Sequence, residues 1–259
     1  MKKLILTITL LLLTFVSFNV VLGDTLAQET QFNNITIFIR FNDETDYEAP
    51  YDYSYYDDMF NATDQPSLKN YYLEVSYGTL TIDSFIPTNY GNIIFYTDTY
   101  DREYFEPYSE LNPDGVPENG QAEREHNLIK RALDYVDESN IIPDELNLDV
   151  NNDGEIDSVT FMISGEDNGW NSLLWPHKWE LYSFTNYNGD FDVDAPMING
   201  VYAYRYTWEL LGNSQSYENQ VDVGVLAHET FHLLGAPDLY HYYKYLDVTP
   251  VGYWGLMEN

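Results

Sequence analysis

The stretch HETFHLLGAPD, residues 228–238, contains the pattern H-E-x-x-H-x-x-G-x-x-D and constrains the fold of the whole chain. On a helix, His228 and His232 lie about one turn apart, so both imidazoles leave the same face and can bind one metal ion. Gly235 can adopt a left-handed conformation, which ends the helix and turns the chain back. That turn brings Asp238 toward the ion as a third ligand. Three protein ligands leave a fourth position open for water, as in catalytic zinc sites.

Glu229 lies one step round this helix, where a carboxylate could take the proton from a zinc-bound water. The competing interpretation is a buried amphipathic helix that carries two incidental histidines. That interpretation must treat Gly235 and Asp238, at the spacing of a turn and a ligand, as further coincidences. The pattern therefore favours a catalytic zinc site with Glu229 as the general base.

The first 23 residues are predicted to be a signal peptide. Lys2 and Lys3 form its positive end, the stretch 4–22 is almost wholly apolar, and cleavage is expected before Asp24. The apolar stretch is also nearly long enough to act as a membrane anchor, which is the competing interpretation. We expect export with cleavage, a secreted protein without stable membrane association, and one domain over residues 24–259. The absence of cysteine from the sequence excludes disulfides.

The net charge of −32 is strongly acidic for a chain of 259 residues. Such a surface argues against nucleic acid or an anionic membrane as partner. It suits a protein that works in salt or in calcium-containing medium, and it equally suits a simple adaptation for solubility.

The residue pattern predicts a mixture of strands and helices without regular alternation. Strands are expected at 35–41, 79–86, 93–96, 158–164 and 201–207, helices at 67–75, 120–136 and 221–234, and a surface excursion at 42–58. This order predicts an α+β domain in which the metal-binding helix packs against a mixed β-sheet.

The acidic segment 149–157 precedes one of the expected strands and spaces its oxygen donors as a calcium loop does. The donors are Asp149, Asn151, Asp153, Glu155 and Asp157, with Gly154 at the sixth position. Position twelve is Thr160 instead of the bidentate glutamate of an EF-hand. The alternative is an acidic turn that needs no ion, and the pattern leaves both open.

Four segments together resemble the immune inhibitor A-like family of secreted metallopeptidases, in the order of that family. They are ITIFIRFND (35–43), SLKNYYLEVSYGTLTI (67–82), DVNNDGEIDSVTFMISG followed by LLWPHKW (149–165 and 173–179), and GVLAHETFHLLGAPDLY followed by VGYWGLMEN (224–240 and 251–259). The family's zinc-binding pattern falls on His228, Glu229, His232, Gly235 and Asp238.

The resemblance implies a zincin fold, peptide hydrolysis, and a tight turn below the zinc that contains Met257. It also favours calcium binding by the acidic loop. The chain departs from the family in two ways. Only about ten residues lie between Gly23 and the first strand, where the family commonly has a prosegment. The chain stops two residues after Met257, where the family continues into a C-terminal subdomain, so the domain is expected to be incomplete.

Several further residues are candidates for the site. Glu258 is an alternative third ligand, although the spacing favours Asp238. His177 could line the substrate cleft, although a histidine between aromatic residues is more often a packed one, and His126 is expected on a helix surface. One of Tyr240, Tyr242 and Tyr243, or His241, could hydrogen-bond the oxyanion of the reaction.

The sequence thus predicts a secreted zinc endopeptidase that acts on polypeptides. The alternative is a non-enzymatic, acidic, calcium-stabilised exported binding protein that retains a zinc site.

Overall fold

The computed structural model describes residues 30–169, 172–212, 221–240, 251–252 and 254–258. The predicted signal peptide, residues 1–23, lies outside these ranges. Among the residues described, no helix is long and apolar enough to cross a membrane.

The strands are β1 (Thr30–Arg40), β2 (Leu80–Phe85), β3 (Thr88–Asn89), β4 (Asn92–Ile93), β5 (Phe95–Thr97), β6 (Ser158–Ile163), β7 (His177–Glu180), β8 (Met197–Ile198), β9 (Val201–Tyr202) and β10 (Arg205–Leu210). The helices are α2 (Tyr53–Asn61), α3 (Leu68–Val75), α4 (Gln121–Glu138) and α5 (Val223–Leu233), with short 3-10 turns η1 (Asn42–Glu44), η2 (Arg102–Phe105), η3 (Tyr182–Phe184) and η4 (Leu256–Glu258).

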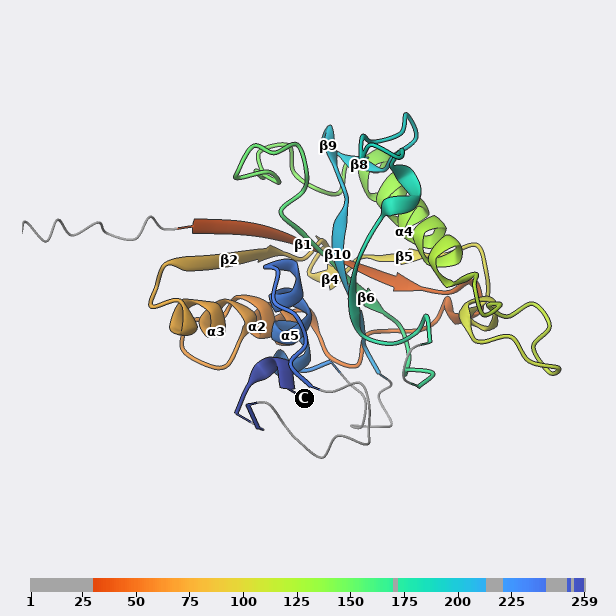
Figure 1. The fold of residues 1–259 in the computed structure, drawn as a ribbon, viewed down its shortest axis with the longest axis horizontal. Coiled ribbons are helices and arrows are strands. Elements are labelled where there is room, and N and C mark those ends of the chain that lie inside the picture. The colour runs from red at the N-terminus through yellow and green to blue at the C-terminus, as the bar shows by residue number, and fades with distance from the viewer. Residues whose placement is uncertain (1–29, 170–171, 213–220, 241–250, 253, 259) are drawn as a thin grey trace, which may run out of the picture.

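The main sheet has the strand order β2-β1-β6-β10-β7, and β5 also pairs with β1 (Figure 1). The strand β1 is long enough for β2 and β5 to pair with different halves of it. All of these pairs are parallel except that of β7 with β10, which is antiparallel. The expected α+β domain with a mixed sheet is therefore confirmed.

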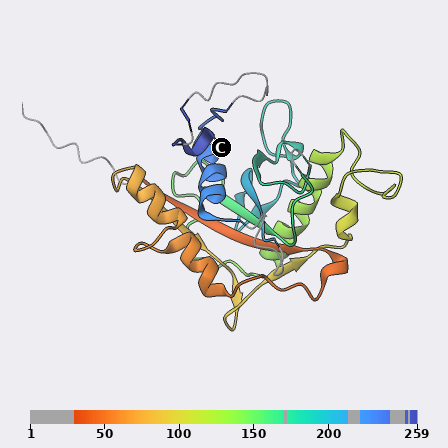
Figure 2. The ribbon, with the colours of Figure 1, turned by 90° about the horizontal axis from the view of Figure 1, so that it is seen from below.

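The two faces of the sheet form two separate hydrophobic cores, because successive side chains of a strand point to opposite faces. Ile35, Ile37 and Ile39 of β1 belong to the core that α4 covers, whereas Phe38 belongs to the core beneath α2, α3 and α5. In the turned view, α4 lies at the other end of the molecule from α2 and α3 (Figure 2).

The helix α5, which carries the metal-binding pattern, packs against β10 and β7 and against α3. Leu226 and Ala227 of α5 are buried in the second core. The hydroxyl of Tyr72 on α3 donates a hydrogen bond of 2.7 Å to the Ala227 carbonyl. The predicted packing of the metal-binding helix on the sheet is confirmed. The helix α5 is held by the sheet on one side and by α3 on another.

Several expectations about local structure were wrong or incomplete. The expected strand at 93–96 is divided between β4 and β5, which pair with β3 and β1. The stretch 42–58 is not only a surface excursion, because α2 begins within it. The expected strand at 201–207 is two strands, β9 and β10, which pair with different partners. The edge strand β7 was not predicted at all.

Candidate metal centre

The local sequence explains where α5 begins and ends. The Asp222 side chain caps the N-terminus by accepting a hydrogen bond of 2.9 Å from the Val225 amide. At the other end, Gly235 has a φ of 92°, a left-handed conformation that favours glycine. The Ala236 amide bonds back to the Phe231 carbonyl, which closes the helix end. The predicted turn at Gly235 is therefore confirmed.

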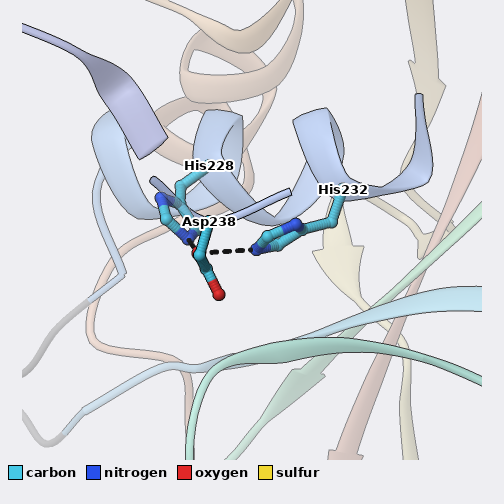
Figure 3. Close-up of side chains that lie close together, drawn as sticks. All are labelled: His228, His232 and Asp238. Carbon is cyan, nitrogen blue, oxygen red and sulfur yellow. Dashed lines mark ion pairs between the residues drawn. The ribbon is translucent and has the colours of Figure 1, made fainter. Parts of the chain in front are cut away.

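This turn brings Asp238 between the two histidines of α5 (Figure 3). Asp238 Oδ1 lies 3.2 Å from His228 Nε2 and 3.2 Å from His232 Nε2. Ligand atoms of the three residues lie within 4.8 Å of one another. Within the described ranges, this is the only group of at least three histidine, cysteine, aspartate or glutamate residues that could hold a metal ion. The sequence predicted the same three residues as ligands.

The other ring nitrogen of each histidine faces a backbone carbonyl. His228 Nδ1 lies 2.9 Å from the Leu256 oxygen, and His232 Nδ1 lies 2.8 Å from the Ala236 oxygen. A carbonyl oxygen only accepts hydrogen bonds, so each Nδ1 carries a proton, and each Nε2 of a neutral ring carries a lone pair. Two lone pairs and a carboxylate that meet at one point repel one another unless a cation lies between them. The donor set therefore fits a metal ion, with the outer hydrogen bonds that commonly orient histidine ligands.

Glu258, the alternative third ligand, does not belong to this group. It is buried in the turn η4, which also contains the predicted Met257. The turn is tied to the metal centre by two contacts, because Leu256 supplies the carbonyl that orients His228, and the Met257 carbonyl accepts a hydrogen bond of 2.7 Å from the Leu239 amide.

Glu229 is buried on α5, with 7% of its surface exposed. Burial raises the pKa of Glu229, and the neighbouring imidazoles of His228, His232 and His177 offset only part of that rise. The position suits a carboxyl group that exchanges a proton inside a cleft.

Two adjoining hollows, with cavity volumes of about 880 Å³ and 590 Å³, meet at this carboxyl group. The residues that line both are Trp175, Pro176, His228, Glu229 and Tyr240. The two hollows therefore adjoin at the metal centre, and together they form the cleft beside it.

His177, which the sequence offered as a cleft residue, does line this cleft from β7, in the hollow that His228 and His232 also line. It is also held in place, since its Nε2 lies 2.9 Å from Glu125 Oε1. Tyr240 lines the cleft as well, whereas the other candidates for an oxyanion partner, His241, Tyr242 and Tyr243, lie outside the described residues.

The expected surface position of His126 was wrong, because its side chain is fully buried on α4. His126 lies three and seven residues before Ile129 and Leu133, so it falls on the apolar stripe of the helix. Its Nδ1 lies 2.8 Å from the Ser183 hydroxyl. The helical spacing in the sequence could have shown this burial, although the partner could not be predicted.

The acidic loop at 149–157 already uses much of its oxygen for internal hydrogen bonds. Both carboxylate oxygens of Asp149 accept bonds from backbone amides of the loop, and Asp153 Oδ1 accepts one from the Glu155 amide. Arg205 contacts Asp153 and Glu155 at 3.7 Å and 3.1 Å. Asp157 bonds the amides of Asn33 and Val150. These contacts agree with the acidic-turn alternative, and calcium binding stays a prediction.

If the loop does bind calcium, protein stripped with chelator and resupplied with zinc should melt at a higher temperature when millimolar calcium is added. Binding to the folded state alone contributes about 2.7 kcal/mol at a free calcium concentration about 100 times the Kd. Asp153→Ala should abolish the response without changing zinc content. Asp190→Ala, which removes a carboxylate from another exposed turn, should leave the response intact. A melting temperature indifferent to calcium would establish the ion-free turn.

A comparison with known proteins found no protein-family model that matches the chain and no curated protein that matches it.

Proposed function

We propose that this chain is a secreted zinc endopeptidase with a zincin-like domain of the immune inhibitor A type. The observation that carries the proposal is the convergence of His228, His232 and Asp238 on one point, beside a buried Glu229 and in the floor of a cleft. Histidine nitrogens and a carboxylate suit zinc and also other divalent metals. The choice of zinc rests on the helical H-E-x-x-H pattern and on the family resemblance.

A zinc ion held by these three side chains would polarise the scissile carbonyl and lower the pKa of an attacking water to about 7. The protein's own contribution comes from Glu229. Its carboxylate would take the proton of the attacking water and then deliver it to the nitrogen of the leaving amine. The backbone carbonyls of Leu256 and Ala236 would hold His228 and His232 in the tautomer that presents Nε2. The cleft on both sides of Glu229 would accommodate the polypeptide.

The test is metal analysis of the purified protein together with a protease assay on casein. We expect about one zinc per chain, loss of casein cleavage with a chelator such as 1,10-phenanthroline, and recovery with zinc. Bound zinc without cleavage of any protein substrate would favour the alternative of an acidic exported binding protein. Absence of a stoichiometric metal would contradict both.

A further inference from the structure

Glu125 is a carboxylate in the core beside the cleft. Its side chain on α4 is only 1% exposed, and burying an unpaired charge to that degree is strongly unfavourable. It has two donors: the Tyr206 hydroxyl on β10 and His177 Nε2, at 2.9 Å, on β7. Burial and the Glu125 charge both raise the pKa of Tyr206 far above its usual value, so that hydroxyl keeps its proton and donates. Both donors reach the same oxygen, Glu125 Oε1, so this oxygen acts as the acceptor toward β10 and toward β7.

Both ring nitrogens of His177 face acceptors. Nε2 faces the Glu125 carboxylate, and Nδ1 lies 2.5 Å from the Trp175 carbonyl oxygen. Neither partner has a proton to donate, so the geometry calls for a proton on each nitrogen and a positive charge on the ring. The ring also stacks on Trp208, with centroids 6.0 Å apart. His177 is thus held from two edges and one face, and 24% of its side chain remains exposed.

The exposed part of His177 lines the hollow that also contains Glu229 and the three metal-binding side chains. The hydrogen bonds to Glu125 and Trp175 occupy both N–H groups, so the ring acts on this hollow through its charge. A positive charge fixed in a cleft wall stabilises negative charge that develops nearby, at no cost of reorganisation.

We propose that Glu125 and His177 form an ion pair that fixes an imidazolium charge beside the metal centre, where it stabilises the negative charge that develops on the scissile carbonyl oxygen. Glu125 is then a positioning residue that acts through His177. This inference rests on the proposed peptidase function.

The surrounding groups give the proposal a pH dependence. His177 is faced by Glu125 and His126 from α4, by Tyr206 from β10 and by Glu229 from α5. Burial works against protonation, but the Glu125 charge, its hydrogen bond and the Trp175 carbonyl outweigh it and raise the pKa of His177. A group with a raised pKa keeps its proton to higher pH. Removal of the Glu125 charge should therefore move the loss of the imidazolium to lower pH.

The test is Glu125→Gln in the zinc-loaded protein. At pH 7 we expect kcat on a neutral peptide substrate to fall on the order of 10- to 100-fold, with KM and zinc content unchanged. The alkaline limb of the kcat profile should shift to lower pH. The nitrogen chemical shifts of His177 should independently report an imidazolium in the parent protein at pH 7 and a neutral ring in the variant.

The chain offers a matched control in Asp98→Asn. Asp98 is also a buried carboxylate that is paired with a cation, Arg131 at 2.8 Å, and accepts from a tyrosine hydroxyl, that of Tyr96. None of these three residues lines the hollow with the metal centre. This variant should keep the parental kcat and profile. If Glu125→Gln fails to fold, His177→Gln tests the same point, because it should lower kcat by a similar factor without a rise in KM.

Three results would overturn the proposal: a parental kcat in Glu125→Gln, a neutral His177 ring in the parent protein at pH 7, or a rise in KM confined to acidic substrates. The last would assign the charge to recognition of a substrate carboxylate. A zinc-loaded parent protein that cleaves no peptide would refute the peptidase function and with it the catalytic role. The chemical shifts would still report whether the ion pair exists, so the two failures are distinguishable.

Discussion

Glu229→Gln is expected to lower kcat on casein-derived peptides by about 10²- to 10⁴-fold, the range that general acid–base groups contribute. The amide has the shape of the carboxyl group but cannot accept the proton of the attacking water. Glu229 is not one of the three convergent ligands, so zinc stoichiometry should stay at the parental value. The measurements are initial rates with a fluorogenic peptide and metal content by elemental analysis after dialysis.

Glu258→Gln is the matched control, since Glu258 lines the same hollow and is equally buried, with 7% exposed. It should retain the parental kcat. Turnover by Glu229→Gln at the parental rate would exclude Glu229 as the general base. If Glu258→Gln were the variant that lost activity, the role of base would pass to that residue.

Asp238→Ala is expected to weaken zinc binding by more than about 100-fold, because loss of an outer-shell partner alone costs about 10- to 100-fold. The variant would leave His228 and His232 as the only convergent ligands, whereas catalytic zinc sites use three. After dialysis against a weak chelator we expect little zinc and no cleavage. The affinity should be measured by competition with a chromogenic zinc indicator.

The control is Glu258→Ala, which removes the alternative ligand. It should bind zinc as the parent protein does. Asp238→Asn adds a graded comparison, because it keeps an oxygen at the same place without its charge and should bind with intermediate affinity. Unchanged affinity in Asp238→Ala would show that the third ligand is another residue.

The metal ligands could be predicted from sequence because all three are local. His228, His232 and Asp238 span eleven residues, and helix geometry with a glycine turn places them without knowledge of the rest of the fold. The same holds for α3, whose start at Ser67 was predicted. The Ser67 hydroxyl accepts a hydrogen bond of 2.9 Å from the Asn70 amide, as an N-cap does.

Elements rich in tyrosine were harder to predict. The helix α2 buries Tyr56, Met59 and Phe60 at helical spacing, and Asp52 caps it. Tyrosine and aspartate alternate through this stretch, so the acidic character obscured the apolar stripe. The hairpin of β8 and β9, which was not predicted, had a visible signal in the Asn199-Gly200 sequence. Asn199 and Gly200 both have positive φ, which is typical of an Asn-Gly hairpin turn.

The cleft wall could not be predicted, because its contacts join distant segments. Glu125 is 52 residues from His177 and 81 residues from Tyr206 in sequence. Helical spacing does place Glu125 on the apolar stripe of α4, three and four residues before Leu128 and Ile129. Residue type alone favours an exposed position for glutamate and histidine, and only the tertiary fold shows which partners Glu125 meets.

The pairing of β1 also has a consequence for how the chain folds. The strands β2 and β5 can join β1 early, but β6 lies far along the chain, and Asn34 and Ser158, which face each other, are 124 residues apart. At a synthesis rate of about 5 to 20 residues per second, that interval lasts on the order of ten seconds. During this time, one edge of a strand rich in isoleucine has no partner, and such edges promote aggregation. We therefore expect slow folding, a refolding yield that falls with protein concentration, and protection by a chaperone that covers the open edge until β6 is made.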